Sequence, residues 1–350
     1  MNITRLNTKY LDSINRRIDQ KTKPVGALGQ LETLATQLAL IASNRQGELA
    51  NNIKISKPTA LVFAGDHGIS VEGVSIAPSD VTRQMVLNFI HGGAAINCFC
   101  TANNITLKVI DAGIIKPIDD DIKAQHGNFI EQRLGSGTHN FAKQPAMTEL
   151  QVEQGLDFGK HIALKQIEQG CNLLILGEMG ISNTSSAAAI LAALTGANIT
   201  DCVGSGTGIN SEQLALKKQL IEHALMRIQN NNSKHILEQV GGFEIVQMVG
   251  AILAAAEAGI AVLIDGFIVS AAALLAKQIN ENVGDYLIFA HQSDESGHQL
   301  LLREFNATPL LNLNLRLGEG TGAALALPLL QAAVHFYNDM ASFEQAGVTV

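Results

Sequence analysis

Short apolar runs alternate with helix-length segments along most of this chain, and this alternation limits the possible folds more than any other feature. A strand that is joined to its neighbour through a helix normally pairs with it in parallel, because a parallel pair needs a long crossover connection. We therefore predict strands at the apolar runs Thr59–Ala64, Leu107–Ile110, Asn172–Leu176, Ile199–Val203, Ala261–Ile264 and Tyr286–Ala290.

The segments between these runs have the length and apolar spacing of helices. We predict helices at Val81–Asn97, Glu149–Gln169, Ser185–Leu194, Ser211–Gln229, Ile245–Ala258 and Ser270–Gln278. The sequence thus predicts an α/β fold with three layers, in which a mainly parallel, Rossmann-like sheet carries helices on both faces.

The two ends of the chain differ from this central pattern, because both are helical without strands. We expect residues 56–330 to form one large α/β domain. Residues 1–55 and 331–350 are expected to form a small helical lobe beside it that does not fold independently. The segment Lys116–Ala146 has few apolar periods and is expected to be a long excursion or surface hairpin.

Composition excludes several classes of protein. Hydrophobic residues make up 47% of the chain and charged residues 16%, which favours a large packed core over disorder. The net charge of −8 gives no electrostatic footprint for a nucleic acid. The apolar stretch Ile245–Ala276 is interrupted by Glu257 and Asp265, so we expect no membrane span. A polar start and only four cysteines predict reduced thiols and a cytoplasmic location.

The residues that follow the predicted strands indicate where a ligand binds. In an open α/β sheet, ligands bind outside the carboxyl ends of the strands. Glycine, carboxylate and histidine residues gather at these positions: Gly65-Asp66-His67-Gly68, Asp111-Ala112-Gly113, Gly177-Glu178-Met179-Gly180, Gly204-Ser205-Gly206-Thr207-Gly208, Asp265-Gly266 and His291-Gln292-Ser293. Their succession predicts a single site at this edge of the sheet.

Glu319 is the strongest candidate for acid–base chemistry. It lies between glycines in the segment Leu317–Gly322 and is followed by a small, apolar run. Glycines allow a backbone to approach a ligand closely, and apolar surroundings raise the pKa of a carboxyl group toward neutral pH. The alternative is a carboxylate that only compensates the dipole at the start of a helix.

The glycine-rich segment Gly204–Gly208 is a candidate phosphate site. Backbone N–H groups in such a loop, with the hydroxyls of Ser205 and Thr207, can hold a phosphate at a helix N-terminus. Lys217 would add a positive charge. The segment is neither a P-loop nor a complete dinucleotide fingerprint, so an ordinary glycine-rich turn is the alternative.

Other functions remain open from the residues alone. Carboxylates at strand ends could hold magnesium in a metal-dependent phosphohydrolase, formed by Asp66, Asp111 and Asp265 with His67, His291 and His298 nearby. No zinc-ligand spacing is present among them. A second alternative is a protein that binds a nucleotide or azole without catalysis, although such a binder would not need a carboxylate at position 319.

The motifs, taken in order, resemble the nicotinate-nucleotide–dimethylbenzimidazole phosphoribosyltransferase (CobT) family. The resemblance covers almost the whole chain and rests on Thr22-Lys23-Pro24-Val25-Gly26-Ala27-Leu28-Gly29, Leu31-Glu32, Gly65-Asp66-His67-Gly68, Val81-Thr82-Arg83-Gln84-Met85-Val86, Gly92-Gly93-Ala94-Ala95-Ile96-Asn97, Gly177-Glu178-Met179-Gly180-Ile181, Gly204-Ser205-Gly206-Thr207-Gly208, Asp265-Gly266-Phe267, His291-Gln292-Ser293 and Gly318-Glu319-Gly320-Thr321-Gly322.

This resemblance implies that phosphoribose passes from nicotinate mononucleotide to 5,6-dimethylbenzimidazole with inversion, giving α-ribazole 5′-phosphate and nicotinate for the lower ligand of cobalamin. It implies a homodimer that needs no metal or other cofactor. Glu319 would be the general base and Glu178 would assist it. The remaining roles implied are substrate binding by Ser75, Gln84, Met179, Gly180, Gly204, Ser205, Gly206, Thr207, Gly208, Lys217, Asp265, Ser293 and Leu317.

The chain departs from the family pattern at four positions. Ala27 replaces an expected serine, Ser182 an expected glycine, Ser296 an expected proline and Val269 a small polar residue. None of them is the presumed base. The preferred aromatic base is therefore the property that we expect these differences to affect.

Overall fold

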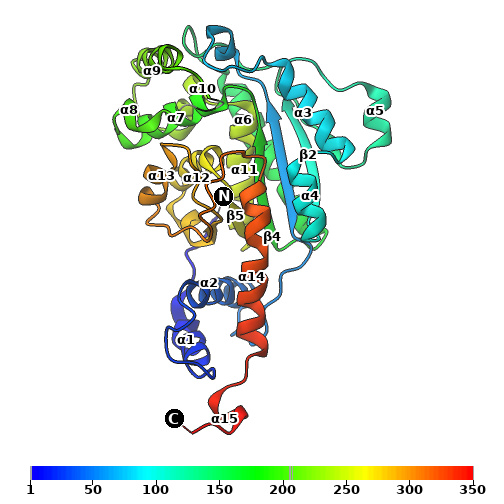
Figure 1. Ribbon diagram of the computed structural model, residues 1–350, viewed down its shortest axis with the longest axis vertical. Coiled ribbons are helices and arrows are strands. Elements are labelled where there is room, and N and C mark those ends of the chain that lie inside the picture. Colours follow the sequence, from blue (N-terminus) through cyan, green and yellow to red (C-terminus); the bar gives the residue numbers. More distant parts are fainter. Residues whose placement is uncertain (1, 205, 207, 350) are drawn as a thin grey trace.

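A single sheet of six parallel strands forms the centre of the computed structural model, which describes residues 2–204, 206 and 208–349 (Figure 1). The order across the sheet is β3-β2-β1-β4-β5-β6, and every neighbouring pair is parallel. The strands are β1 (Thr59–Gly65), β2 (Thr106–Gly113), β3 (Phe129–Glu131), β4 (Leu173–Met179), β5 (Ala261–Ile264) and β6 (Leu287–Phe289). The predicted α/β class with a parallel, Rossmann-like sheet is confirmed.

Helices cover both faces of the sheet (Figure 1). On one face, α3 (Asp80–His91), α4 (Ala95–Ala102) and α14 (Thr321–Asp339) contact the strands. On the other face, α11 (Phe243–Glu257) contacts β1, β2, β4 and β5, and α6 (Glu149–Glu168) packs against α11. Every residue of β1 is buried, as expected for a strand that is covered on both sides.

Most of the remaining helices lie around the edges of these layers. They are α5 (Asp120–Gln125), α7 (Asn183–Thr195), α8 (Ile199–Cys202), α9 (Ser211–Leu225), α10 (Ser233–Val240), α12 (Phe267–Ile279), α13 (His298–Glu304) and the 3-10 helices η1 (Thr8–Tyr10), η2 (Gly68–Glu72) and η3 (Glu281–Tyr286). Of these, α12 also contacts β4 and β5 and packs against α7, α11 and α13.

Two predictions about the strands were wrong. The run Ile199–Val203 contains the short helix α8, whose start is capped by the Asn198 side chain, an acceptor for the Thr200 N–H. The sixth strand is instead β3, which lies in the segment 116–146 that was expected to be an excursion. β3 pairs with Val109–Asp111 of β2 at the edge of the sheet. Its partial exposure explains why its apolar pattern is weak.

The predicted helix Val81–Asn97 is two helices, α3 and α4. Gly92 ends α3 with a φ of 86°, a left-handed conformation that glycine adopts without steric cost. Residues 80–102 together have the length and hydropathy of a membrane span, and about a third of their most apolar 18-residue stretch is buried in the protein. Separately, the two helices have only 12 and 8 residues, fewer than the about 20 that cross a bilayer.

The terminal helices lie together below the sheet (Figure 1), where α1 (Leu11–Asp19) and α2 (Gln30–Gln46) lie beside the far end of α14, followed by α15 (Phe343–Ala346). The Tyr337 hydroxyl of α14 donates to the Ala50 carbonyl at 2.9 Å. The boundary drawn at residue 330 falls inside α14, so one continuous helix belongs to both parts. The division into a large domain and a lobe stays a prediction.

The order of the strands determines where a ligand would bind. The chain moves outward in one direction from β1 to β3 and in the other from β4 to β6, so the order reverses between β1 and β4. Adjacent loops separate at such a reversal and leave a crevice at the carboxyl ends of the strands.

Candidate active site

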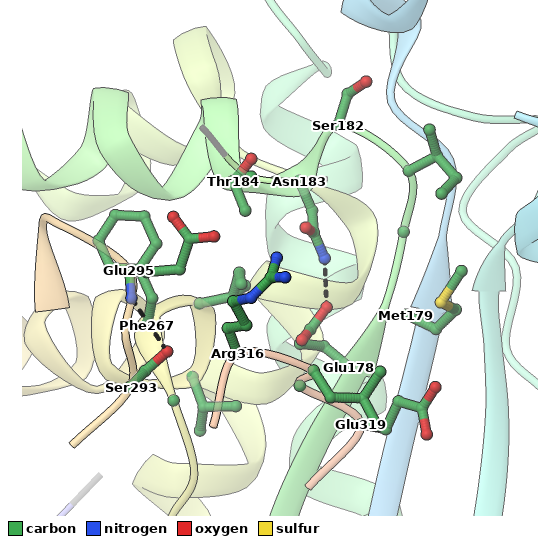
Figure 2. Close-up of a pocket in the computed structure, with 18 of the residues that line it drawn as sticks. Glu178, Met179, Ser182, Asn183, Thr184, Phe267, Ser293, Glu295, Arg316 and Glu319 are labelled. Atoms are coloured by element: carbon green, nitrogen blue, oxygen red, sulfur yellow. Dashed lines mark hydrogen bonds between the residues drawn. The ribbon is translucent and has the colours of Figure 1, made fainter. Parts of the chain in front are cut away.

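A pocket of about 390 Å³ opens at the carboxyl ends of the strands (Figure 2). It is lined by the end of β4 with the start of α7, by the segments that follow β5 and β6, and by the turn that precedes α14. Its lining residues are Val74, Ser75, Met85, Glu178, Met179, Gly180, Ile181, Ser182, Asn183, Thr184, Gly206, Gly266, Phe267, Ile268, Val269, His291, Ser293, Glu295, Arg316, Leu317, Gly318 and Glu319. Its size suits a small nucleotide-like molecule.

Glu319 lies in an unusual turn directly before α14. Gly318, Glu319 and Gly320 have φ angles of 84°, 64° and 84°, so three successive residues are left-handed. A left-handed glutamate is uncommon and strained, and such strain is often found at functional sites. The turn lies directly against β4, because a Cβ added at Gly177 would overlap the Glu319 carbonyl. Glycine at position 177 thus permits this close approach.

Glu319 is 4% exposed and lines the pocket. Its pKa is raised to about 7, chiefly by burial and also by the charge of Asp265, against a hydrogen bond from the Ile96 backbone at the start of α4. Its Oε2 atom has no hydrogen-bond partner in the described structure. An unpartnered carboxyl oxygen with a pKa near neutrality is well suited to accept a proton.

Glu178, at the end of β4, is the second buried carboxyl group of the pocket. Its pKa is raised to about 8, chiefly by burial and also by the charges of Glu244, Asp265 and Glu319, against the hydrogen bond from Asn183. Figure 2 shows the Asn183 amide pointing at this carboxyl group, to which it donates. Both carboxyl groups therefore keep their protons to a higher pH than an ordinary glutamate, and Glu178 keeps its proton to a higher pH than Glu319.

Asp265, one of the predicted substrate-binding residues, is not among the residues that line the pocket. Its carboxylate accepts the backbone N–H groups of Gly320 and Ala323 at 3.1 and 2.9 Å. It therefore caps the start of α14 and fixes the turn that carries Glu319. His291 Nε2 lies 3.5 Å from the same carboxylate.

Of the predicted substrate-binding residues, Ser75, Met179 and Leu317 line the pocket. Gln84 is exposed on α3, and its neighbour Met85 lines the pocket instead. The buried positions of α3 are Thr82, Val86, Phe89 and Ile90, a spacing from which the inward face could have been read. Gly180 and Ser293 also line the pocket.

Only part of the predicted phosphate loop, Gly204–Gly208, lines the pocket. Gly206 lines it, Gly204 and Gly208 do not, and Ser205 and Thr207 fall outside the described residues. The loop follows α8 rather than a strand. Lys217 is 1% exposed and lies behind the wall, where its Nζ donates to Thr184 Oγ1 at 2.8 Å.

The sequence reading missed two charged residues of the pocket, Arg316 and Glu295. Arg316 directly precedes the Leu317–Gly322 motif, and this adjacency was the available signal. Glu295 follows Ser293 by two residues, but its position depends on contacts across the pocket.

Two of the four departures from the family pattern, Ser182 and Val269, line the pocket. Ser182 has a left-handed φ of 75°, which explains why a glycine was expected at this position.

The residues of the proposed magnesium site are used in other ways. Asp66 accepts the Ile115 N–H at 2.7 Å, and Asp111 accepts two backbone N–H groups and pairs with Arg133. His67 lies between Ser186 and Glu244, fully buried. No group of three or more potential metal ligands occurs within the described part of the chain. Asp66, Asp111 and Asp265 therefore do not form a joint metal site.

Fold and pocket together describe a doubly wound α/β protein with a nucleotide-sized site at the carboxyl edge of its sheet. Residues 3–348 match the family described as phosphoribosyltransferase, and the chain belongs to this family.

Relatives share this assignment over their full length. The nicotinate-nucleotide–dimethylbenzimidazole phosphoribosyltransferase of Vibrio parahaemolyticus is 57% identical over 347 residues, covering 99% of this chain and 100% of its own. That of Vibrio cholerae is 56% identical over 345 residues, with the same coverage. The crystal structure of CobT from Thermus thermophilus superposes with a TM-score of 0.92 at 41% identity, covering 97% of this chain and 99% of its own.

Proposed function

We propose that this chain transfers phosphoribose from nicotinate mononucleotide to 5,6-dimethylbenzimidazole, with inversion at C1′ and release of nicotinate. The product would be α-ribazole 5′-phosphate, used for the lower ligand of cobalamin. The observation that carries this proposal is Glu319, a buried carboxyl group with a pKa of about 7 and a free oxygen in a pocket with apolar walls. The names of its relatives support the choice of substrates.

The two ends of the pocket fit the two ends of such a reaction. In Figure 2, Glu319 and Met179 lie toward one side, and Thr184 and Glu295 toward the other. We assign the flat benzimidazole to the first side, where Met179 and Leu317 supply apolar walls. The 5′-phosphate is assigned to the second side, beside Gly206, Arg316 and the buried Lys217.

The reaction needs one proton transfer from the substrate to the protein. Glu319 accepts the N–H proton of the benzimidazole while the other ring nitrogen of the benzimidazole forms a bond to C1′. The bond between C1′ and the nicotinate ring breaks, and its electron pair neutralises the positive ring nitrogen of the leaving group. Attack from the face opposite the leaving ring gives inversion. Holding the two rings in line would supply much of the acceleration.

Glu178 has a supporting role in this proposal. Because its pKa lies above that of Glu319, it keeps its proton when Glu319 ionises and adds little negative charge beside the base. It can then donate a hydrogen bond to the ribose or to the ring. If Glu319 were removed, Glu178 could accept the proton in part, at a higher pH.

The test is a chromatographic assay with nicotinate mononucleotide and 5,6-dimethylbenzimidazole in the presence of a chelator. We expect nicotinate and α-ribazole 5′-phosphate in equal amounts from the wild type. Glu319→Gln should lower kcat by roughly 100-fold or more, the usual contribution of a general base. Full activity in Glu319→Gln would reject the base assignment. Release of inorganic phosphate from the nucleotide that the chelator abolishes, without α-ribazole 5′-phosphate, would favour the phosphohydrolase alternative. If the wild type forms no product even without chelator, either 5,6-dimethylbenzimidazole is not the acceptor or the chain does not catalyse this transfer.

The assembly and location implied by the resemblance are proposals as well. We propose a homodimer in the cytoplasm that binds neither nucleic acid nor membrane. Light scattering on the purified chain would give the mass of the assembly, and a monomeric mass at the concentrations of the activity assay would reject the dimer.

A further inference from the structure

The cationic end of the pocket already contains an anionic side chain. Glu295, in the segment between β6 and α13, lines the pocket together with Thr184, Gly206 and Arg316. Its Oε2 atom lies so close to Gly204 that a Cβ there would overlap it. Figure 2 shows the carboxyl group beside Thr184 and Phe267.

The groups that stabilise this carboxylate are ones that would also bind a phosphate. Burial raises the pKa of Glu295, and the positive charges of Lys217 and Arg316 and a hydrogen bond from the Gly206 backbone oppose that rise. A Cβ at Gly206 would lie 3.6 Å from Lys217 Nζ and 3.1 Å from Thr184 Oγ1, so the glycine and both side chains converge. Two cations, a hydroxyl and a backbone N–H form an anion site.

Of the carboxylates in the described part of the chain, Glu295 is the one whose charge affects the pKa of Lys217. The pKa of Lys217 is lowered to about 8 by burial, against the charge of Glu295, which favours the protonated amine. A buried cation without a counter-charge is costly, and Glu295 supplies that charge when no substrate is bound.

We propose that Glu295 is the resident anion of the phosphate site and that the 5′-phosphate of the substrate must displace it. The proposal rests on the proposed function for the identity of the substrate. Glu295 then acts as a specificity device: a weakly bound anion such as inorganic phosphate does not displace it easily, whereas a nucleotide does because its ribose and ring contribute binding energy. Glu295 is itself partly exposed and lies between the exposed residues Asp294 and Ser296, so its displaced carboxylate can turn toward solvent while the backbone stays in place.

The first experiment measures binding of inorganic phosphate by calorimetry at pH 6.5, where Lys217 is protonated in the wild type. Glu295→Gln should tighten phosphate binding about tenfold, the factor expected when a site is open only about a tenth of the time. The control is Glu304→Gln, the same chemical change at an exposed glutamate of α13, which should alter binding by less than about twofold. Unchanged or weaker phosphate binding in Glu295→Gln would overturn the proposal.

The second experiment measures KM for nicotinate mononucleotide and for nicotinate riboside, which lacks the phosphate. Glu295→Gln should lower KM for the nucleotide only. An equal effect on both would mean that Glu295 does not act on the phosphate, and a higher KM for the nucleotide would mean that it assists binding; both would overturn the proposal. Phosphate binding needs no turnover. If the wild type fails the transfer assay but Glu295→Gln still binds inorganic phosphate more tightly, this inference holds although the proposed reaction is rejected.

Discussion

Two carboxyl groups of one pocket acquire different protonation states because of what each one touches. Glu178 is buried and receives a hydrogen bond from Asn183, yet burial and the surrounding carboxylates place its pKa at about 8. Glu319 has fewer charged neighbours, and its pKa is about 7. Near pH 7 the pair therefore shares one proton or more, and Glu319 is the first to lose its own.

The pH dependence of the reaction should report Glu319. A base must be deprotonated, so kcat/KM for 5,6-dimethylbenzimidazole should rise with pH and level off above about 7. Glu319→Asp keeps a carboxylate and should retain an acid limb at reduced activity, whereas Glu319→Gln should lose that limb. Steady-state rates from about pH 5.5 to about pH 8.5, a range that brackets ordinary and raised carboxyl pKa values, measure this. A wild-type limb near the usual glutamate pKa would contradict a raised pKa.

Glu178 should make the protein less stable as the pH rises. Its folded pKa of about 8 lies above the ordinary value of 4.5, so its contribution is fully present below about 4.5 and is lost as the pH rises through about 8. Glu178→Gln mimics the protonated form and should be similar to the wild type at pH 5. At pH 8 it should unfold with a free energy higher by on the order of 1–3 kcal/mol.

Urea unfolding at the two pH values measures this difference. Glu153→Gln, an exposed glutamate of α6, is the control and should show no comparable pH dependence. Equal stabilities of Glu178→Gln and the wild type at both pH values would contradict the raised pKa.

At the scale of elements, the start of α14 positions Glu319, the proposed base. Asp265 follows β5, 55 residues before Gly320 in the chain, and it holds the backbone N–H groups of Gly320 and Ala323. The same carboxylate adds to the effect of burial in raising the pKa of Glu319. Asp265 is therefore a positioning residue that affects both the geometry and the protonation of Glu319 without lining the pocket.

Asp265→Asn should move the acid limb of the pH profile to lower pH, because the negative charge that raises the Glu319 pKa is removed. It should also destabilise the fold by about 1–2 kcal/mol through the weakened cap. The matched control is Asp80→Asn in the first turn of α3, whose carboxylate is 65% exposed and pairs with Lys116. A lower rate with an unmoved limb would show that Asp265 acts on geometry alone.

At the scale of the molecule, the chain ends are attached to the sheet by contacts that are far apart in sequence. The Leu6 N–H donates to Asp285 at 2.9 Å, and the Gln37 amide donates to the Leu287 carbonyl of β6 at 2.9 Å. α2 packs on α14, which also contacts β4. Residues of both proposed parts thus belong to one connected hydrophobic core.

This connection predicts one cooperative unfolding transition for the whole chain. Tyr337→Phe removes the buried hydrogen bond to Ala50 and should lower the stability by about 1 kcal/mol without splitting the transition. Calorimetry and far-UV circular dichroism on the same sample would test it. An earlier transition confined to residues 1–55 would show that the lobe unfolds on its own.

Much of the fold could be predicted because its signals are local. The apolar runs of β1, β4 and β5, the helices between strands and the glycines around Glu319 are all patterns within a few residues. β3 and α8 were not predicted correctly, since a three-residue edge strand is defined by its partner β2, and the Asn198 cap outweighs the apolar character of Ile199–Val203.

The sequence by itself determined the parallel α/β class, and it predicted the edge of the sheet at which the pocket opens and the carboxyl group that we propose as the base. Around Glu319, the backbone geometry and the burial follow from residues that are neighbours in the sequence. Only the tertiary structure decided that Asp265 caps α14, that Met85 rather than Gln84 faces the pocket, and that Glu295 meets Gly204 and the charges of Lys217 and Arg316. These contacts join segments that are distant in the chain, and electrostatic energies depend on distance in space.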